Sequence, residues 1–154
     1  MTKKKTIVDV FEHSTSAYAN NTFLMEKVGR EWTHTTYKQV QQMVYQLGAG
    51  LQQIGVSKGD CMALLSEGRN LWIVSELAMF YAGAINVPLS IKLEESNDLL
   101  FRMKHGDVKY IIVSGTQLKK VRAIRQELTA VQRVIVLDKQ TNWEEGETGV
   151  DEDM

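Results

Sequence analysis

The sequence is poor in the residues that most often reveal a protein's chemistry. Among its 154 residues there is one cysteine, Cys61, and one proline, Pro88. A single cysteine excludes an internal disulfide framework and a zinc site built from several cysteines. It is also typical of proteins that live in a reducing compartment, so we expect a cytoplasmic protein.

Long apolar runs and a strong excess of one charge are missing as well. No stretch of about 18 apolar residues occurs, so the sequence predicts no membrane-spanning helix. Eighteen basic residues stand against 19 acidic ones, which leaves a net charge of −1. This balance gives no reason to expect nucleic acid as a partner, because phosphate backbones bind clustered lysine and arginine. The basic start at Lys3–Lys5 runs into a segment with interspersed acidic residues, which is wrong for a signal peptide.

Two glycine-containing turns could hold an anion at the start of a helix. Residues 66–70 and 114–116 each join a predicted strand to a predicted helix, and a helix N-terminus favours negative charge. However, Glu67 disfavours a phosphate in the first turn, and the second lacks the spacing of a phosphate-binding loop. We interpret both as ordinary strand-to-helix turns and keep anion binding as the less favoured alternative.

The histidines and the cysteine are predicted to be structural. His13, His34 and His105 lie in different kinds of predicted element and lack the paired spacing that is usual for metal ligands. Cys61 falls within a predicted buried strand, where cysteine is more often a small hydrophobe than a nucleophile. A Gly-x-Ser-x-Gly elbow is also missing. We therefore assign no catalytic, cofactor-binding or metal-binding residue to this chain.

The clearest element in the sequence is a helix over residues 36–54. Thr36 and Gln39 form a capping box at its start, and apolar residues then recur at three- and four-residue steps. Gly48 and Gly50 lower the helix propensity by roughly 1 kcal/mol each. Their presence indicates that the helix packs closely against a sheet.

Strands and helices alternate after that helix, and a β-hairpin precedes it. The hairpin covers residues 23–35, where Gly29 suits the first position of a type II′ turn. Further strands are expected at residues 61–65, 84–87, 110–113 and 133–138. Between them we expect three helices, with Asn70, Ser96 and Thr116 as their N-caps. The pattern predicts a doubly wound α/β domain over residues 1–140, with a mostly parallel sheet and helices on both faces.

The end of the sequence is strongly acidic. From Trp143 to Met154 there are six acidic residues and no basic ones. Such runs rarely pack, so we interpret residues 141–154 as a solvated, flexible end. The alternative is a connection that leads to a further element of a longer chain.

The stretch from Thr36 to Val113 resembles the opening of the adenylate-forming (AMP-binding) superfamily, which includes acyl-CoA synthetases, luciferases and adenylation domains. The resemblance is carried, in order, by Thr36–Val40, Lys58–Asp60, Ala63–Ser66, Gly83–Leu89 and Asp107–Val113. Within the superfamily, the chain is most similar to the N-terminal part of a long-chain fatty-acid–CoA ligase. Two departures are Cys61, where the family often has a polar residue, and residues 89–93, which lack the usual aromatic and proline character.

The resemblance implies an ATP-dependent ligase that activates a fatty acid as an acyl-adenylate and passes it to coenzyme A. ATP, Mg²⁺ and coenzyme A are then expected for the full-length parent, with none of them bound by this portion. The family's catalytic motifs cannot be placed here, so we expect the portion to be inactive alone, with the remainder of the parent chain as its partner. Apolar surface left uncovered would favour self-association. The alternative is a freestanding α/β binding or regulatory module without adenylation activity.

Overall fold

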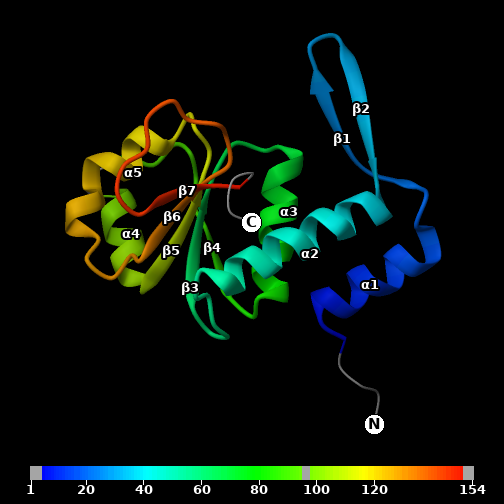
Figure 1. Ribbon diagram of the computed structural model, residues 1–154, viewed down its shortest axis with the longest axis horizontal. Helices are drawn as coiled ribbons and strands as arrows, with labels where there is room; N and C mark the ends of the chain where they lie inside the picture. Colours follow the sequence, from blue (N-terminus) through cyan, green and yellow to red (C-terminus); the bar gives the residue numbers. More distant parts are fainter. Residues whose placement is uncertain (1–4, 95–97, 151–154) are drawn as a thin grey trace.

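The computed structural model describes residues 5–94 and 98–150, which form a sheet-centred body with a helix and a hairpin on one side (Figure 1). The helices are α1 (Ile7–Tyr18), α2 (Tyr37–Gln53), α3 (Asn70–Tyr81), α4 (Leu100–His105) and α5 (Leu118–Ile124), with a 3-10 turn at Arg125–Glu127. The strands are β1 (Thr22–Val28), β2 (Glu31–Thr36), β3 (Cys61–Leu65), β4 (Ile85–Pro88), β5 (Val108–Val113), β6 (Arg133–Val136) and β7 (Glu147–Gly149). In this part of the chain no helix is both long and apolar enough to span a bilayer.

The central sheet has five parallel strands in the order β4-β3-β5-β6-β7. Side chains of β3 alternate between its faces. Met62 and Leu64 join a core with α2 and α3, while Ala63 and Leu65 join a second core with α4 and α5. Figure 1 shows the two helix pairs on opposite sides of the sheet. The predicted doubly wound α/β fold is therefore confirmed.

The predicted hairpin and the start of the long helix are also confirmed. β1 pairs antiparallel with β2, and Gly29 takes a φ of +63° in the turn between them. At the start of α2, the backbone N–H of Gln39 donates to Thr36 Oγ1 at 3.2 Å. The backbone N–H of Thr36 in turn donates to Gln39 Oε1 at 2.8 Å. This reciprocal pair is the capping box that the sequence indicates.

Two of the other predicted N-caps are wrong. Arg69 is the N-cap of α3, and Asn70 is already its first helical residue. The N–H of Asn70 donates instead to Glu26 Oε1, 3.4 Å away on the hairpin. Helix α5 begins at Leu118 rather than after Thr116, and no side chain caps it. The third predicted cap, Ser96, lies outside the described residues.

Gly48 permits a close helix–helix contact and not the helix–sheet contact that we expected. A Cβ atom at this position would lie 3.4 Å from the carbonyl oxygen of Ala78 and 3.5 Å from Cβ of Tyr81, both on α3. The absence of a side chain therefore lets α2 and α3 approach each other on one face of the sheet.

Helix α1 is tied to α2 and α3 through one carboxylate. Glu12 Oε2 accepts a hydrogen bond from Gln41 Nε2 at 2.9 Å, and Glu12 Oε1 accepts from the hydroxyls of Tyr45 and Tyr81. Burial and the bond to this carboxylate both raise the pKa of Tyr81 above its usual value, so its hydroxyl stays a donor. The contact fixes the position of α1 on the body.

The acidic end is not entirely a solvated loop, because residues 147–149 form β7 on the edge of the sheet. The side chain of Glu147 is only 4% exposed and accepts hydrogen bonds from Arg122 Nε at 2.8 Å and Nη2 at 2.7 Å. Burial raises the pKa of the Glu147 carboxyl, but the bonds from Arg122 and from the backbone N–H of Glu144 outweigh this and hold it below its usual value.

We predict that Glu147→Gln makes the domain less stable at neutral pH by about 1–3 kcal/mol, because a charged hydrogen-bond pair is lost. Because folding lowers the pKa of the Glu147 carboxyl, this group stabilises the folded state fully above its pKa in the unfolded chain, about 4.3. The stabilisation is lost as the pH falls through its pKa in the folded chain. The variant should therefore lose less stability than the wild type on acidification. Urea unfolding at neutral and acidic pH measures both effects. Glu145→Gln, at an exposed position, is the control, and an equal effect of the two substitutions would contradict the prediction.

Candidate functional site: the carboxyl edge of the sheet

The loops that follow β3, β5 and β6 meet at the carboxyl edge of the sheet, where ligands bind in open α/β folds. They comprise residues 66–69, 114–117 and 137–140. Because the three strands are adjacent and parallel, all three loops emerge on the same side. The two turns that the sequence indicated as anion-site candidates are thereby brought together, and the loop after β6 joins them.

Asp138 is the central residue of this edge. Its carboxylate accepts from Arg69 Nη1 at 2.8 and 3.0 Å and from the backbone N–H of Gly115 at 2.7 Å. A guanidinium and a backbone N–H next to a helix are the groups that commonly bind a phosphate. Here they bind a carboxylate of the protein itself, which occupies the position where an external anion would sit.

Gly115 allows Asp138 to approach this closely. A Cβ atom at residue 115 would lie 2.8 Å from Gln140 Nε2 and 3.1 Å from Cβ of Asp138. Gln140 Nε2 also donates to the carbonyl oxygen of Asp138 at 3.0 Å. The glycine thus brings the second and third loops together and does not form a phosphate cradle.

Glu67 links the first loop to the second. Its Oε1 accepts from Gln117 Nε2 at 2.6 Å. Burial raises the pKa of this carboxyl, but the bond from Gln117, the nearby hydroxyl of Ser114 and the charge of Arg69 together hold it below its usual value. Glu67 is therefore an anion at neutral pH, which agrees with the expectation that this turn disfavours phosphate.

Two buried polar groups at this edge have no hydrogen-bond partner among the described residues. They are the hydroxyl of Ser114, which lies near Glu67 without reaching hydrogen-bonding geometry, and Oε1 of Gln117. Buried polar groups are usually satisfied, by protein or by ordered water. The edge can thus accept a further hydrogen bond at Gln117, although Arg69 and Asp138 are already paired with each other.

An open groove of about 490 Å³ lies between the hairpin and the first of these loops. Met25, Lys27 and Trp32 line one side, and Gly68 and Arg69 line the other. Met25 and Trp32 are at least half exposed, so the hairpin leaves much of its apolar surface in contact with water. The guanidinium of Arg69 connects this groove to the cluster around Asp138.

The histidines and the cysteine lie away from the carboxyl edge. His13 is on α1, His34 is on β2 and His105 is the last residue of α4. Cys61 is partly buried at the amino end of β3, the opposite edge of the sheet. Across residues 5–94 and 98–150, no group of three or more His, Cys, Asp or Glu side chains is arranged to hold a metal ion.

Sequence reasoning missed Asp138 and Gln117 as members of the site. Asp138 directly follows a predicted strand, so the rule for carboxyl ends could have placed it beside the two turns. Its pairing with Arg69, 69 residues earlier, has no local signal in the sequence. Gln117 directly follows the second predicted turn, and nothing local in the sequence indicates that its partner is Glu67, 50 residues earlier.

This α/β architecture matches the AMP-binding enzymes. A profile of the family described as AMP-binding enzyme matches residues 11–153. The chain therefore belongs to this family. It is 25% identical over 139 residues to a long-chain-fatty-acid–CoA ligase from Thermus thermophilus, covering 90% of this chain and 26% of that protein. It is 26% identical over 137 residues to long chain acyl-CoA synthetase 7, peroxisomal, from Arabidopsis thaliana, covering 86% of this chain and 19% of that protein.

A solved structure shows the same fold. The crystal structure of a putative long-chain-fatty-acid CoA ligase from Rhodopseudomonas palustris superposes with a TM-score of 0.82 at 20% identity, covering 97% of this chain and 36% of that one. The resemblance to the N-terminal part of a long-chain fatty-acid–CoA ligase is thereby confirmed. The chain spans about a quarter or less of the length of the curated relatives described above.

We predict that Asp138→Ala releases the anion-binding groups of the edge. Arg69 and the N–H of Gly115 lose their carboxylate, which should lower stability by about 1 kcal/mol, since the pair is partly exposed. The variant should then be stabilised by sulfate more than the wild type is. Thermal unfolding in sulfate and in chloride at matched ionic strength measures this. Asp98→Ala, at an exposed position, is the control. Equal responses of wild type and Asp138→Ala to sulfate would contradict the prediction.

Proposed function

We propose that this chain is the N-terminal portion of an ATP-dependent acyl-CoA synthetase that activates a fatty acid as an acyl-adenylate and transfers it to coenzyme A. In this proposal the portion is inactive alone and supplies a rigid α/β body to the rest of the enzyme. Membership of the AMP-binding enzyme family is the observation that carries the proposal. The names of the Thermus and Arabidopsis relatives favour a fatty acid as the substrate.

The hydrogen bonds at the carboxyl edge support the proposal that this portion does not itself bind the nucleotide. Its guanidinium and the N–H of Gly115 are engaged by Asp138, so a nucleotide phosphate would have to displace an internal carboxylate. Catalysis of acyl transfer needs donors directed at the charge that develops on the substrate. In the proposed parent enzyme, those donors and the groups that hold ATP, Mg²⁺ and coenzyme A come from the remainder of the chain.

A second candidate function is a freestanding binding module that performs no adenylation. The groove beside the hairpin favours it, because exposed Trp32 and Met25 lie next to the paired Arg69. Such a module would bind a partner or small molecule there without chemistry. The two candidates differ in whether a longer polypeptide that contains this sequence forms acyl-CoA.

We predict that the chain alone releases no pyrophosphate from ATP in the presence of a fatty acid and coenzyme A, because its charged groups at the carboxyl edge are engaged with one another. A coupled pyrophosphate assay measures this, with the Thermus thermophilus ligase as the positive control. Turnover above that of the heat-denatured chain would contradict the fragment proposal.

We also predict that the chain shows no measurable affinity for ATP·Mg and at most a millimolar dissociation constant for a medium-chain fatty acid. A groove that is open on one side leaves ligand surface in water and does not offset the costs of association. Calorimetry with each ligand tests this. Saturable micromolar binding of ATP would favour the freestanding module. Its loss in Arg69→Ala, but not in Lys104→Ala at an exposed position in the last turn of α4, would locate the site at the carboxyl edge.

A further inference from the structure

Three oxygen-bearing side chains from two loops meet at the carboxyl edge of the sheet. Glu67 lies in the loop after β3, while Ser114 and Gln117 lie in the loop after β5. Gln117 Nε2 donates to Glu67 Oε1 at 2.6 Å, which holds the amide beside the carboxylate. The hydroxyl of Ser114 lies near the same carboxylate. The two loops therefore bring a carboxylate, an amide and a hydroxyl together.

Two of these side chains are buried and carry an oxygen atom without a partner. Ser114 is 0% exposed and Gln117 is 8% exposed. Among the described residues, neither Ser114 Oγ nor Gln117 Oε1 has a hydrogen-bond partner. The amide nitrogen of Gln117 is bonded to Glu67, so its oxygen remains available as an acceptor. Because buried polar atoms are normally satisfied, we expect these oxygens to contact a group that this part of the chain does not supply.

The carboxylate of Glu67 has no countercharge bonded to it. In the described part of the chain it forms no ion pair, and the nearby guanidinium of Arg69 is bonded to Asp138 instead. Two carboxylates and one guanidinium leave one negative charge in excess at this edge. A partly buried charge is costly unless it is paired or binds a metal ion. One added positive charge would balance the group.

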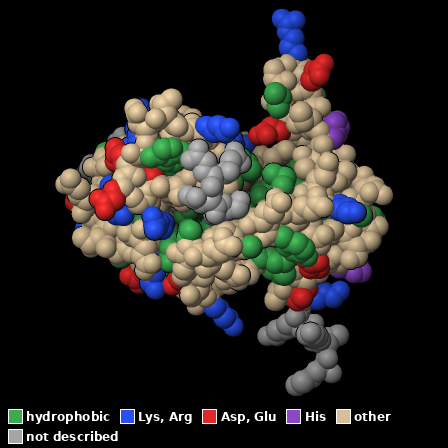
Figure 2. Space-filling view, viewed as in Figure 1, with side chains coloured by type: hydrophobic (Ala, Val, Ile, Leu, Met, Phe, Trp, Pro, Cys, Tyr) green, Lys and Arg blue, Asp and Glu red, His purple; other side chains and the backbone are tan. Residues whose placement is uncertain are grey.

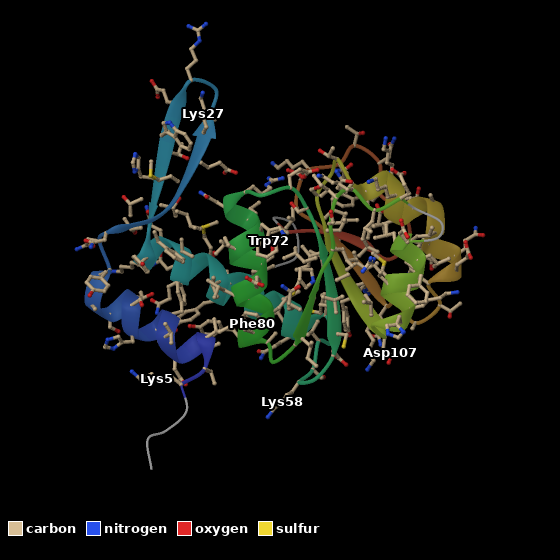
Figure 3. The ribbon with its side chains drawn as sticks, turned by 180° about the vertical axis from the view of Figure 1, so that it is seen from behind. Lys5, Lys27, Lys58, Trp72, Phe80 and Asp107 are labelled. Atoms are coloured by element: carbon tan, nitrogen blue, oxygen red, sulfur yellow. The ribbon has the colours of Figure 1, made fainter. Side chains whose placement is uncertain are left out.

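The surrounding surface does not favour ligands of either charge. Figure 2 shows both acidic and basic side chains along this side of the body, between the hairpin and α5. In Figure 3, Lys58 and Asp107 mark the amino end of the sheet and Lys27 marks the hairpin at the opposite end, where the carboxyl edge lies. Glu67 is partly exposed and directly precedes Gly68, which lines the open groove beside the hairpin. A small ion can therefore reach Glu67 from water, and its selection depends on the three side chains themselves.

We propose that Glu67, Ser114 and Gln117 bind one monovalent metal ion, either sodium or potassium. Carboxylate and amide oxygens are the ligands that hard cations prefer, and neutral carbonyl oxygens coordinate potassium in channels. A divalent ion fits less well, because the site has a single carboxylate and the charge of Arg69 acts on it. Two of the three ligands are neutral, which agrees with the lack of any cluster of three His, Cys, Asp or Glu side chains among the described residues. The inference does not depend on the proposed enzyme activity.

Thermal unfolding of the whole chain in different chloride salts tests the proposal. Sodium and potassium chloride are compared with tetramethylammonium chloride at equal ionic strength, because the methyl groups of that cation keep its charge away from the oxygens. At about a tenfold excess over the dissociation constant, the bound ion should raise the unfolding midpoint by about 3–6 °C. Broadening of the sodium NMR resonance by the folded chain measures binding directly.

Ser114→Ala and Ser75→Ala form a matched pair of variants. Ser75, in α3, is also 0% exposed, and its hydroxyl also lacks a partner among the described residues. In tetramethylammonium chloride neither variant should be less stable than the wild type, because each removes a buried hydroxyl without a partner. Ser114→Ala should bind sodium or potassium about 10-fold more weakly, because an oxygen ligand of a charged group is lost. Ser75→Ala should keep the full response to both ions.

Gln117→Glu tests the third ligand through a change of charge. A second carboxylate beside Glu67 should lower the unfolding midpoint in tetramethylammonium chloride, because two like charges then lie close together. Sodium or potassium should offset this repulsion. The rise in midpoint caused by these ions should therefore be larger in Gln117→Glu than in the wild type.

Three results would overturn the proposal. One is an equal midpoint of the wild type in all three salts, which would leave an ordered water molecule as the partner of the buried oxygens. Another is a response to sodium and potassium that is the same in Ser114→Ala as in Ser75→Ala, or the same in Gln117→Glu as in the wild type. The third is stabilisation by calcium or magnesium that exceeds that by sodium and potassium, because the site would then be a divalent one.

Discussion

The structure depends on one constraint, which is that the central parallel strands must be covered on both faces. β3 and β5 lie inside the sheet, and their successive side chains enter two different cores. Met62 and Leu64 require the layer of α2 and α3, while Ala63 and Leu65 require the layer of α4 and α5. The right-handed crossovers that supply these layers place every strand-to-helix loop at one edge. The site is therefore a consequence of how the strands are buried.

At that edge, charged side chains bind other groups of the same chain. The carboxylate of Asp138 accepts hydrogen bonds from Arg69 and from the backbone N–H of Gly115. Such an arrangement fixes three loops in place but leaves few groups for chemistry. This is consistent with the proposal that the chain supplies a rigid portion of a longer enzyme. The unsatisfied Oε1 of Gln117 is a position where a further donor could dock.

The sequence predicts those features of the fold that depend on residues close to one another in the chain. The capping box of Thr36 and Gln39 and the alternating apolar strands each depend on neighbours within a few positions, and both are confirmed. The caps predicted at Asn70 and Thr116 were each wrong by one residue, since the N-caps of α3 and α5 are Arg69 and Gln117 and neither donates a side-chain cap to its helix. β7 was missed because Glu147 is stabilised by Arg122, 25 residues earlier, and an acidic run gives no sign of that partner.

The two ends of the sheet differ in chemistry. The carboxyl edge has paired charges between three loops, whereas the amino end has exposed isoleucines beside Lys5 and Lys58. The charges that fix the loops at the carboxyl edge are separated from the amino end by the length of the strands, so substitutions at one end should have little effect on the other.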